Sequence, residues 1–184
     1  MYTSSPESTS SPVAIQHTRN QDRLNNLAQK VSPLPAAALA LAQTAREMKV
    51  SATLLKSRST ETLTGQDGTV VRTKAVISAL KSAKDTLKIF ASKADSLGRE
   101  VSFFSNHQEG LYRGNMGIFS QEDKVNWCSA QVDKIARRTQ KLGVNQSLPV
   151  SKAIRDLNWA AGFFGKTIDS DLGVKVSELG RNSQ

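Results

Sequence analysis

The feature that most constrains the fold is a long series of apolar residues spaced alternately four and three positions apart. The longest such series comprises Val76, Leu80, Ala83, Leu87, Phe90, Ala94, Leu97, Val101 and Phe104. A mean spacing of about 3.5 residues places these side chains on one face of an α-helix, where they interdigitate with neighbouring helices. The series therefore predicts a long helix near residues 70–106 that packs against other helices.

Three further series show the same alternation. They are Leu34, Ala38, Leu41, Ala45, Met48, Ala52 and Leu55; Val125, Cys128, Val132, Ile135, Thr139 and Leu142; and Val150, Ile154, Leu157, Ala161, Phe164 and Ile168. Because no useful length of chain alternates with period two, strands are not expected. Since short connections make neighbouring helices reverse direction, we predict an all-α fold, an antiparallel up-down four-helix bundle over residues 19–184.

Turn-forming and capping residues mark where these helices are expected to begin and end. Ser120 followed by Asp123 resembles a capping box that opens the third helix. Gly143 is placed to end that helix, and Pro149 to begin the fourth. Two shorter helices are also expected, near residues 20–31 and 170–179.

The first 18 residues have a different composition. "MYTSSPESTSSP" contains seven serine or threonine residues and two prolines but no apolar block, so residues 1–18 are predicted to be disordered. Such a Ser-rich tail resembles the secretion signals of bacterial type III secreted effectors. The resemblance implies secretion into the host cell cytoplasm and a secretion chaperone that binds the N-terminal region. The alternative location is the bacterial cytoplasm.

Composition narrows the classes of function. The formal net charge of +9 favours an acidic partner. No apolar run reaches the roughly 18 residues that a membrane-spanning helix needs. The single cysteine, Cys128, lies in an apolar series and is interpreted as a small buried hydrophobe rather than a reactive thiol. No group of residues has metal-ligand spacing, so neither a metal nor a cofactor is expected, and no strong catalytic motif indicates an enzyme.

A basic face is expected on the long second helix. Lys74, Lys81 and Lys88 are seven residues apart and therefore share one face, which Lys84 flanks. One interpretation is a solvated surface, and another is a site for an acidic partner. Nucleic acid is an alternative partner, although binding through phosphates alone is weak and depends steeply on salt. A structural or chaperone-like bundle that oligomerises through this helix is a further alternative.

The connection at residues 107–123 is unusual because it combines glycines with apolar residues. Its apolar members are Leu111, Tyr112, Met116, Ile118 and Phe119. A loop of this length in a compact bundle is often functional. We expect its apolar residues to fold back onto the end of the bundle and hold Arg113 outward. The alternative is that Arg113 caps helix carbonyls or pairs with Glu109.

Within this connection, "GLYRGN" at residues 110–115 resembles the arginine-finger motif, G-x-L-R, of bacterial secreted Rho GTPase-activating effectors, which are also four-helix bundles. The sequence departs from the motif at Tyr112, which replaces leucine, and at Gly117, which replaces a threonine. The resemblance implies that Arg113 stabilises the transition state of GTP hydrolysis in a host GTPase. The neighbouring residues that would then contact the GTPase are Gly110, Tyr112, Gly114 and Asn115.

A second motif of the same family, Gln-Trp-Gly-Thr-x-Gly-Gly, is loosely matched by "NWAAGFFG" at residues 158–165. Asn158 and Ala161 depart from it. The resemblance implies that Asn158 and Trp159 also contact the GTPase. The sequence thus predicts a secreted helical bundle that binds a host protein and, through Arg113, regulates a Rho-family GTPase.

Overall fold

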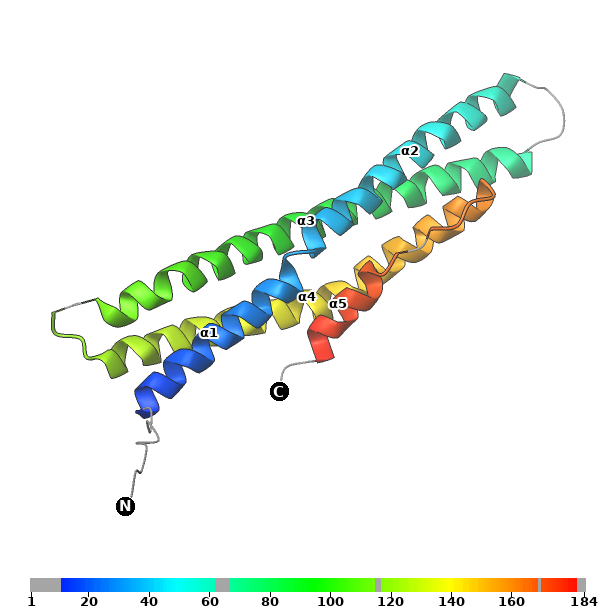
Figure 1. The fold of residues 1–184 in the computed structure, drawn as a ribbon. Helices are drawn as coiled ribbons and strands as arrows, with labels where there is room; N and C mark the ends of the chain where they lie inside the picture. The colour runs from blue at the N-terminus through cyan, green and yellow to red at the C-terminus, as the bar shows by residue number, and fades with distance from the viewer. Residues whose placement is uncertain (1–10, 62–66, 115–116, 169, 182–184) are drawn as a thin grey trace, which may run out of the picture.

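The computed structural model describes residues 11–61, 67–114, 117–168 and 170–181, and in these ranges it contains helices and no strand (Figure 1). The all-α prediction is confirmed. Its helices are α1 (Pro12–Val31), α2 (Leu34–Glu61), α3 (Asp67–Arg113), α4 (Gln121–Phe163) and α5 (Leu172–Arg181). The two shorter helices predicted near residues 20–31 and 170–179 correspond to α1 and α5.

The helices are arranged around α3, which spans about 70 Å at 1.5 Å per residue. Helices α1 and α2 follow one another along the chain, separated by a turn at residues 32–33; α2 packs against α3, and α4 runs alongside α3 (Figure 1). Helix α1 also packs against α4, and α5 packs against α4 and touches α2. The chain breaks at Pro33 because proline lacks the N–H that a continuous helix requires.

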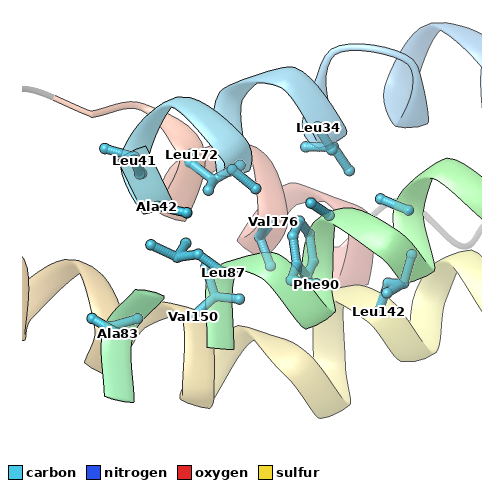
Figure 2. Close-up of a cluster of buried hydrophobic side chains, with 14 of the residues drawn as sticks. Leu34, Leu41, Ala42, Ala83, Leu87, Phe90, Leu142, Val150, Leu172 and Val176 are labelled. Atoms are coloured by element: carbon cyan, nitrogen blue, oxygen red, sulfur yellow. The ribbon is translucent and has the colours of Figure 1, made fainter. Parts of the chain in front are cut away.

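The predicted apolar series form the core. Nearly all of their members are buried or half-buried, and Leu55, at 38% exposed, is the exception. Figure 2 shows the central cluster, where side chains from α2, α3, α4 and α5 meet around Leu87 and Phe90. Burial of large aliphatic and aromatic side chains contributes about 1.5–3 kcal/mol each, so this shared cluster holds the helices together.

The predicted break between a third and a fourth helix was wrong. Helix α4 runs without interruption through both Gly143 and Pro149. Gly143 is buried where α4 meets α5: a Cβ there would lie 2.6 Å from the Gly180 amide nitrogen and 2.7 Å from Leu179 Cβ. The glycine therefore permits close approach of two helices instead of ending one. Pro149 removes one backbone hydrogen bond from α4. The free energy gained by packing α4 against its neighbours exceeds this loss, so the helix continues.

Two other predicted boundaries differ from the structure. Helix α1 begins at Pro12, so residues 12–18, predicted to belong to the disordered tail, are helical. The start is set locally: the Ser11 side chain accepts a hydrogen bond from the Ala14 amide at 3.2 Å, and proline suits the first helical position. Residues 1–10 of the predicted tail lie outside the described residues. Helix α3 continues to Arg113, well into the predicted loop.

Replacing Gly143 with alanine is expected to lower the free energy of unfolding by about 1–3 kcal/mol, because the added methyl group forces α4 and α5 apart. The matched control is Gly162→Ala in the same helix, where a Cβ would meet no atom within 4 Å. Urea denaturation followed by circular dichroism measures both variants. Equal stability of the two would contradict the close approach at Gly143.

Candidate functional site

Arg113 is the last residue of α3 rather than a loop residue. Its guanidinium, 78% exposed, donates a hydrogen bond to Glu109 one turn earlier, which is the pairing that the alternative interpretation predicted. Glu109 also accepts a 2.6 Å hydrogen bond from His17 Nε2 on α1. The hydrogen bonds from His17 and Arg113 together lower the pKa of the Glu109 carboxyl below its ordinary value. Arg113 is thus held near a carboxylate on an open surface.

His17 attaches the start of α1 to the end of α3. Its ring stacks on Tyr112 with a centroid separation of 3.9 Å and an interplanar angle of 11°. This role of His17 was not predicted, because His17 belongs to the stretch predicted to be a disordered tail. No local sequence signal links two residues that are so far apart in the chain and meet only in the folded structure.

A buried polar layer continues this attachment between α1 and its two neighbours. The Asn20 amide donates to the Val125 carbonyl at 3.3 Å and accepts from Ser129 Oγ at 3.1 Å. Gln108, which is 3% exposed, donates to Gln21 Oε1 at 3.0 Å. Since buried polar groups are costly when left unpaired, these hydrogen bonds favour one register of α1 against α3 and α4.

The turn between α3 and α4 is closed by Lys124. This side chain is 8% exposed, and its Nζ donates to the Gly114 carbonyl at 2.6 Å and to the Tyr112 carbonyl at 3.2 Å. A cation at this position satisfies carbonyls that the end of α3 leaves unpaired. The predicted capping box is confirmed, because Ser120 and Asp123 each accept a hydrogen bond from the other's backbone amide.

The apolar residues of the turn do not fold back onto the bundle as predicted. Ile118 is 93% exposed and Phe119 is 55% exposed. Leu111 and Tyr112 are half-buried on the last turn of α3, and Met116 lies outside the described residues. The physical reason is length: α3 extends to Arg113 and α4 begins at Gln121, so too few residues remain to cover the end of the bundle.

These exposed residues join an apolar surface that the sequence analysis did not identify. The Phe103 ring contacts His107 and Phe104, with centroids 4.3 Å and 5.7 Å away, and Phe104 lies 5.9 Å from Trp127. Beside Trp127, a pocket of about 540 Å³ is lined by Leu111, Phe119, Asp123, Lys124 and Trp127. We call this region the aromatic surface; it comprises Phe103, Phe104, His107, Leu111, Ile118, Phe119 and Trp127.

The exposure of the aromatic surface is high for such large side chains. Phe103 is 57% exposed and Trp127 is 51% exposed. Contiguous apolar patches of this kind mark interaction sites on soluble proteins. The sequence carried a partial signal, since Trp127 lies one position from its apolar series, but the juxtaposition of α3 and α4 side chains became visible only in the structure.

The structure does not bring the two predicted GTPase motifs together. Gly110, Tyr112 and Gly114 lie beside Arg113 at the end of α3, whereas Asn115 lies outside the described residues. Asn158 and Trp159 are exposed near the opposite end of α4, about 55 Å from its start at 1.5 Å per residue. Asn158 and Trp159 therefore do not share one contact region with Arg113.

The predicted basic face lies elsewhere on α3. Lys74, Lys81 and Lys88 are exposed and Lys84 is half-buried. All four precede Leu97, so this face lies away from the aromatic surface at the end of the helix. Its proposed role in binding nucleic acid or in oligomerisation stays a prediction.

Other chemistry is limited in the part of the chain that the structure describes. Cys128 is buried, and desolvation raises the pKa of its thiol, which disfavours the reactive thiolate. The described side chains contain no group of three or more His, Cys, Asp or Glu residues arranged to hold a metal ion. Among the described helices, none has the length and apolar character to cross a membrane.

Comparison with protein-family models, curated proteins and solved structures gives no match for this chain. Inference about its function therefore rests on the residues at the end of the α3–α4 pair.

Lys124→Met is expected to reduce the free energy of unfolding by about 1.5–3 kcal/mol, because it leaves the Tyr112 and Gly114 carbonyls unpaired. The control is Lys152→Met on the exposed surface of α4, for which a change within about 0.5 kcal/mol is expected. Guanidinium denaturation compares the two. If both variants lose the same small amount, Lys124 does not close the turn.

Proposed function

We propose that this protein is a protein-binding helical bundle that contacts its partner through the aromatic surface. The observation that carries the proposal is a row of rings in contact, from the exposed Phe103 through the half-buried Phe104 to the exposed Trp127, beside the pocket that Phe119 lines. Aromatic side chains supply much of the binding energy at protein interfaces, especially where they flank a pocket. A partner that covers these rings removes their apolar area from water.

The supports beneath the aromatic surface favour this function. Lys124 fastens the turn, and His17 ties α1 to Glu109 and Tyr112. A surface that is already ordered loses little conformational entropy on binding. The two helices therefore present their exposed rings in one arrangement before the partner arrives.

Trp127→Ala is expected to abolish partner capture, because loss of a central aromatic typically weakens binding by at least about 2 kcal/mol. The control is Trp159→Ala, since Trp159 lies on the same helix and has nearly the same exposure, 52% against 51%. Affinity capture from host-cell extract, quantified by mass spectrometry, compares the variants with the original chain. Equal capture by both variants, with circular dichroism confirming their folding, would refute the proposal.

A more specific candidate is a Rho-family GTPase of the host. It is supported by the resemblance of "GLYRGN" to the arginine-finger motif and by the position of Arg113, exposed beside the aromatic surface at the end of α3. An inserted guanidinium stabilises the charge that develops on the γ-phosphate and accelerates hydrolysis by about 10³–10⁵. In this role Arg113 exchanges its contact with Glu109 for one with the nucleotide.

Arg113→Ala is expected to eliminate stimulated GTP hydrolysis, and Arg113→Lys is expected to fail as well, because lysine lacks the planar fork. The control is Arg99→Ala: Arg99 lies on the same helix, is 82% exposed and pairs with Asp95 one turn earlier. Single-turnover hydrolysis by purified Rho-family GTPases provides the readout. No stimulation by the original chain would exclude this candidate while leaving protein binding intact.

We also propose delivery by a bacterial type III secretion system, supported by the Ser-rich composition of residues 1–18. A reporter fused to residues 1–30 is expected to appear in the medium of secretion-competent bacteria and to stay inside a secretion-deficient strain. Immunoblotting of the two culture supernatants measures this. Retention of the reporter by both strains would place the protein in the bacterial cytoplasm.

We further propose that the middle of the molecule is an antiparallel up-down four-helix bundle, with α5 taking the place predicted for a separate fourth helix. Support comes from the central cluster, to which α2, α3, α4 and α5 all contribute side chains. Spin-label distances between the ends of these helices test the relative directions.

A further inference from the structure

We propose that the partner supplies an acidic amphipathic helix that lies in the groove between α3 and α4, on the side of this pair that α1 does not cover. The inference rests on the proposed function, because the aromatic surface forms one end of this groove. It adds the chemical class of the binding segment and its position along the two helices.

Two hollows define the course of the groove. At one end is the pocket beside Trp127, lined by residues of both helices and the turn. At the other end, a cavity of about 440 Å³ lies between α3 and α4. Its lining consists of Ser92, Lys93, Ser96, Leu97, Arg138, Lys141 and Leu142. Between the two, Arg138 on α4 donates a hydrogen bond to Glu100 on α3.

The residues along the groove repeat every seven positions on both helices. On α3, Leu111 lines the pocket and Leu97 lines the cavity, with Phe104 midway between them. On α4, Trp127 lines the pocket and Lys141 lines the cavity, with the exposed Lys134 midway between them. This repeat keeps the side chains on one face of each helix. From Asp123 to Lys141 the groove is about 27 Å long at 1.5 Å per residue, which accommodates about five helical turns.

A helix fits this groove better than an extended peptide. The same α3–α4 pair already accommodates α1 in the groove on its other side. A helix in a groove binds through apolar residues at i, i+3, i+4 and i+7, which matches the seven-residue repeat along the groove. An extended strand would need unpaired backbone groups along the groove, but an α-helix interior has none to offer.

Charge determines which helix fits. Lys93, Lys134 and Lys141 contribute positive charge along the groove, while Glu100 is already paired with Arg138. An Asp- or Glu-rich flank on the bound helix therefore meets lysines, and its apolar face meets Phe104 and Trp127. Complementary charge of this kind accelerates association and fixes the orientation of the bound segment.

The placement of acidic residues disfavours lipid headgroups and nucleic acid. Asp123 lines the pocket beside Phe119 and Trp127, and Glu122 precedes it in the first turn of α4. Their carboxylates repel phosphates at the place where Ile118 and Phe119 would enter a membrane or stack on bases. A protein helix avoids this repulsion when its acidic flank lies farther along, at Lys134 and Lys141.

Selection of displayed amphipathic helical peptides against the full chain tests this inference. We expect the enriched peptides to carry apolar residues at i, i+3 or i+4, and i+7, with Asp or Glu concentrated on one flank. Binding of the best peptide is expected to weaken at least about tenfold with Trp127→Ala and with the pair Lys134→Glu and Lys141→Glu. The matched control is the pair Lys74→Glu and Lys81→Glu, which has the same spacing and the same change in net charge on exposed lysines outside the groove.

The outcomes separate the two proposals. Absence of enriched peptides, enrichment of basic or neutral ones, or equal loss with the control pair would overturn the acidic-helix inference. The inference would also be overturned if vesicles of equal parts phosphatidylserine and phosphatidylcholine, or a short RNA, bind the original chain and lose that binding only in the groove pair, Lys134→Glu with Lys141→Glu. If Trp127→Ala abolishes capture of host protein but the groove pair does not, protein binding stands and the acidic helix is wrong. If Trp127→Ala leaves capture unchanged, both fail.

Discussion

Burial of the apolar face of α3 is the interaction on which the rest of the structure depends. Helices α1, α2 and α4 all pack against α3, and its Leu87 and Phe90 occupy the centre of the core shown in Figure 2. Each buried side chain of this size contributes about 1.5–3 kcal/mol, and the apolar face runs from Val76 to Phe104. Contact with α3 therefore defines the positions of α1, α2 and α4, and α5 is placed by its contacts with α4 and α2.

At one end of α3 the packing is completed by polar contacts. Lys124 pairs with the last carbonyls of α3, and the Asn20 and Gln108 side chains align α1 with its neighbours. These contacts order the turn but leave the outer face of the α3–α4 pair uncovered. An ordered support with exposed aromatic rings is a typical arrangement for protein recognition, and it connects the architecture with the proposed binding function.

The sequence predicted the fold class and the core more accurately than the connections. The spacing of four and three identified the buried faces of α2, α3 and α4, and the capping box of Ser120 and Asp123 identified the start of α4. The predictions at Gly143 and Pro149 were wrong, because local sequence signals indicated a helix end and a helix start at positions where α4 continues. For the candidate site, the sequence singled out the same end of the α3–α4 pair, around Arg113, but it missed His17, Lys124 and the rings on either side of the groove.

The sequence by itself determined which side chains enter the core, because helical periodicity assigns every residue to a face regardless of its partners. Only the tertiary structure decided that α4 continues past Gly143, since the close contact of Gly143 with α5 depends on residues distant in the chain. It also decided which residues lie together: Phe104 meets Trp127, whereas Arg113 ends α3 beside the start of α4 and Trp159 lies near the other end of α4. Helix formation depends on residues that are close in the sequence, whereas contacts between helices join residues that are far apart in the chain. Sequence periodicity does not determine which of these distant residues meet.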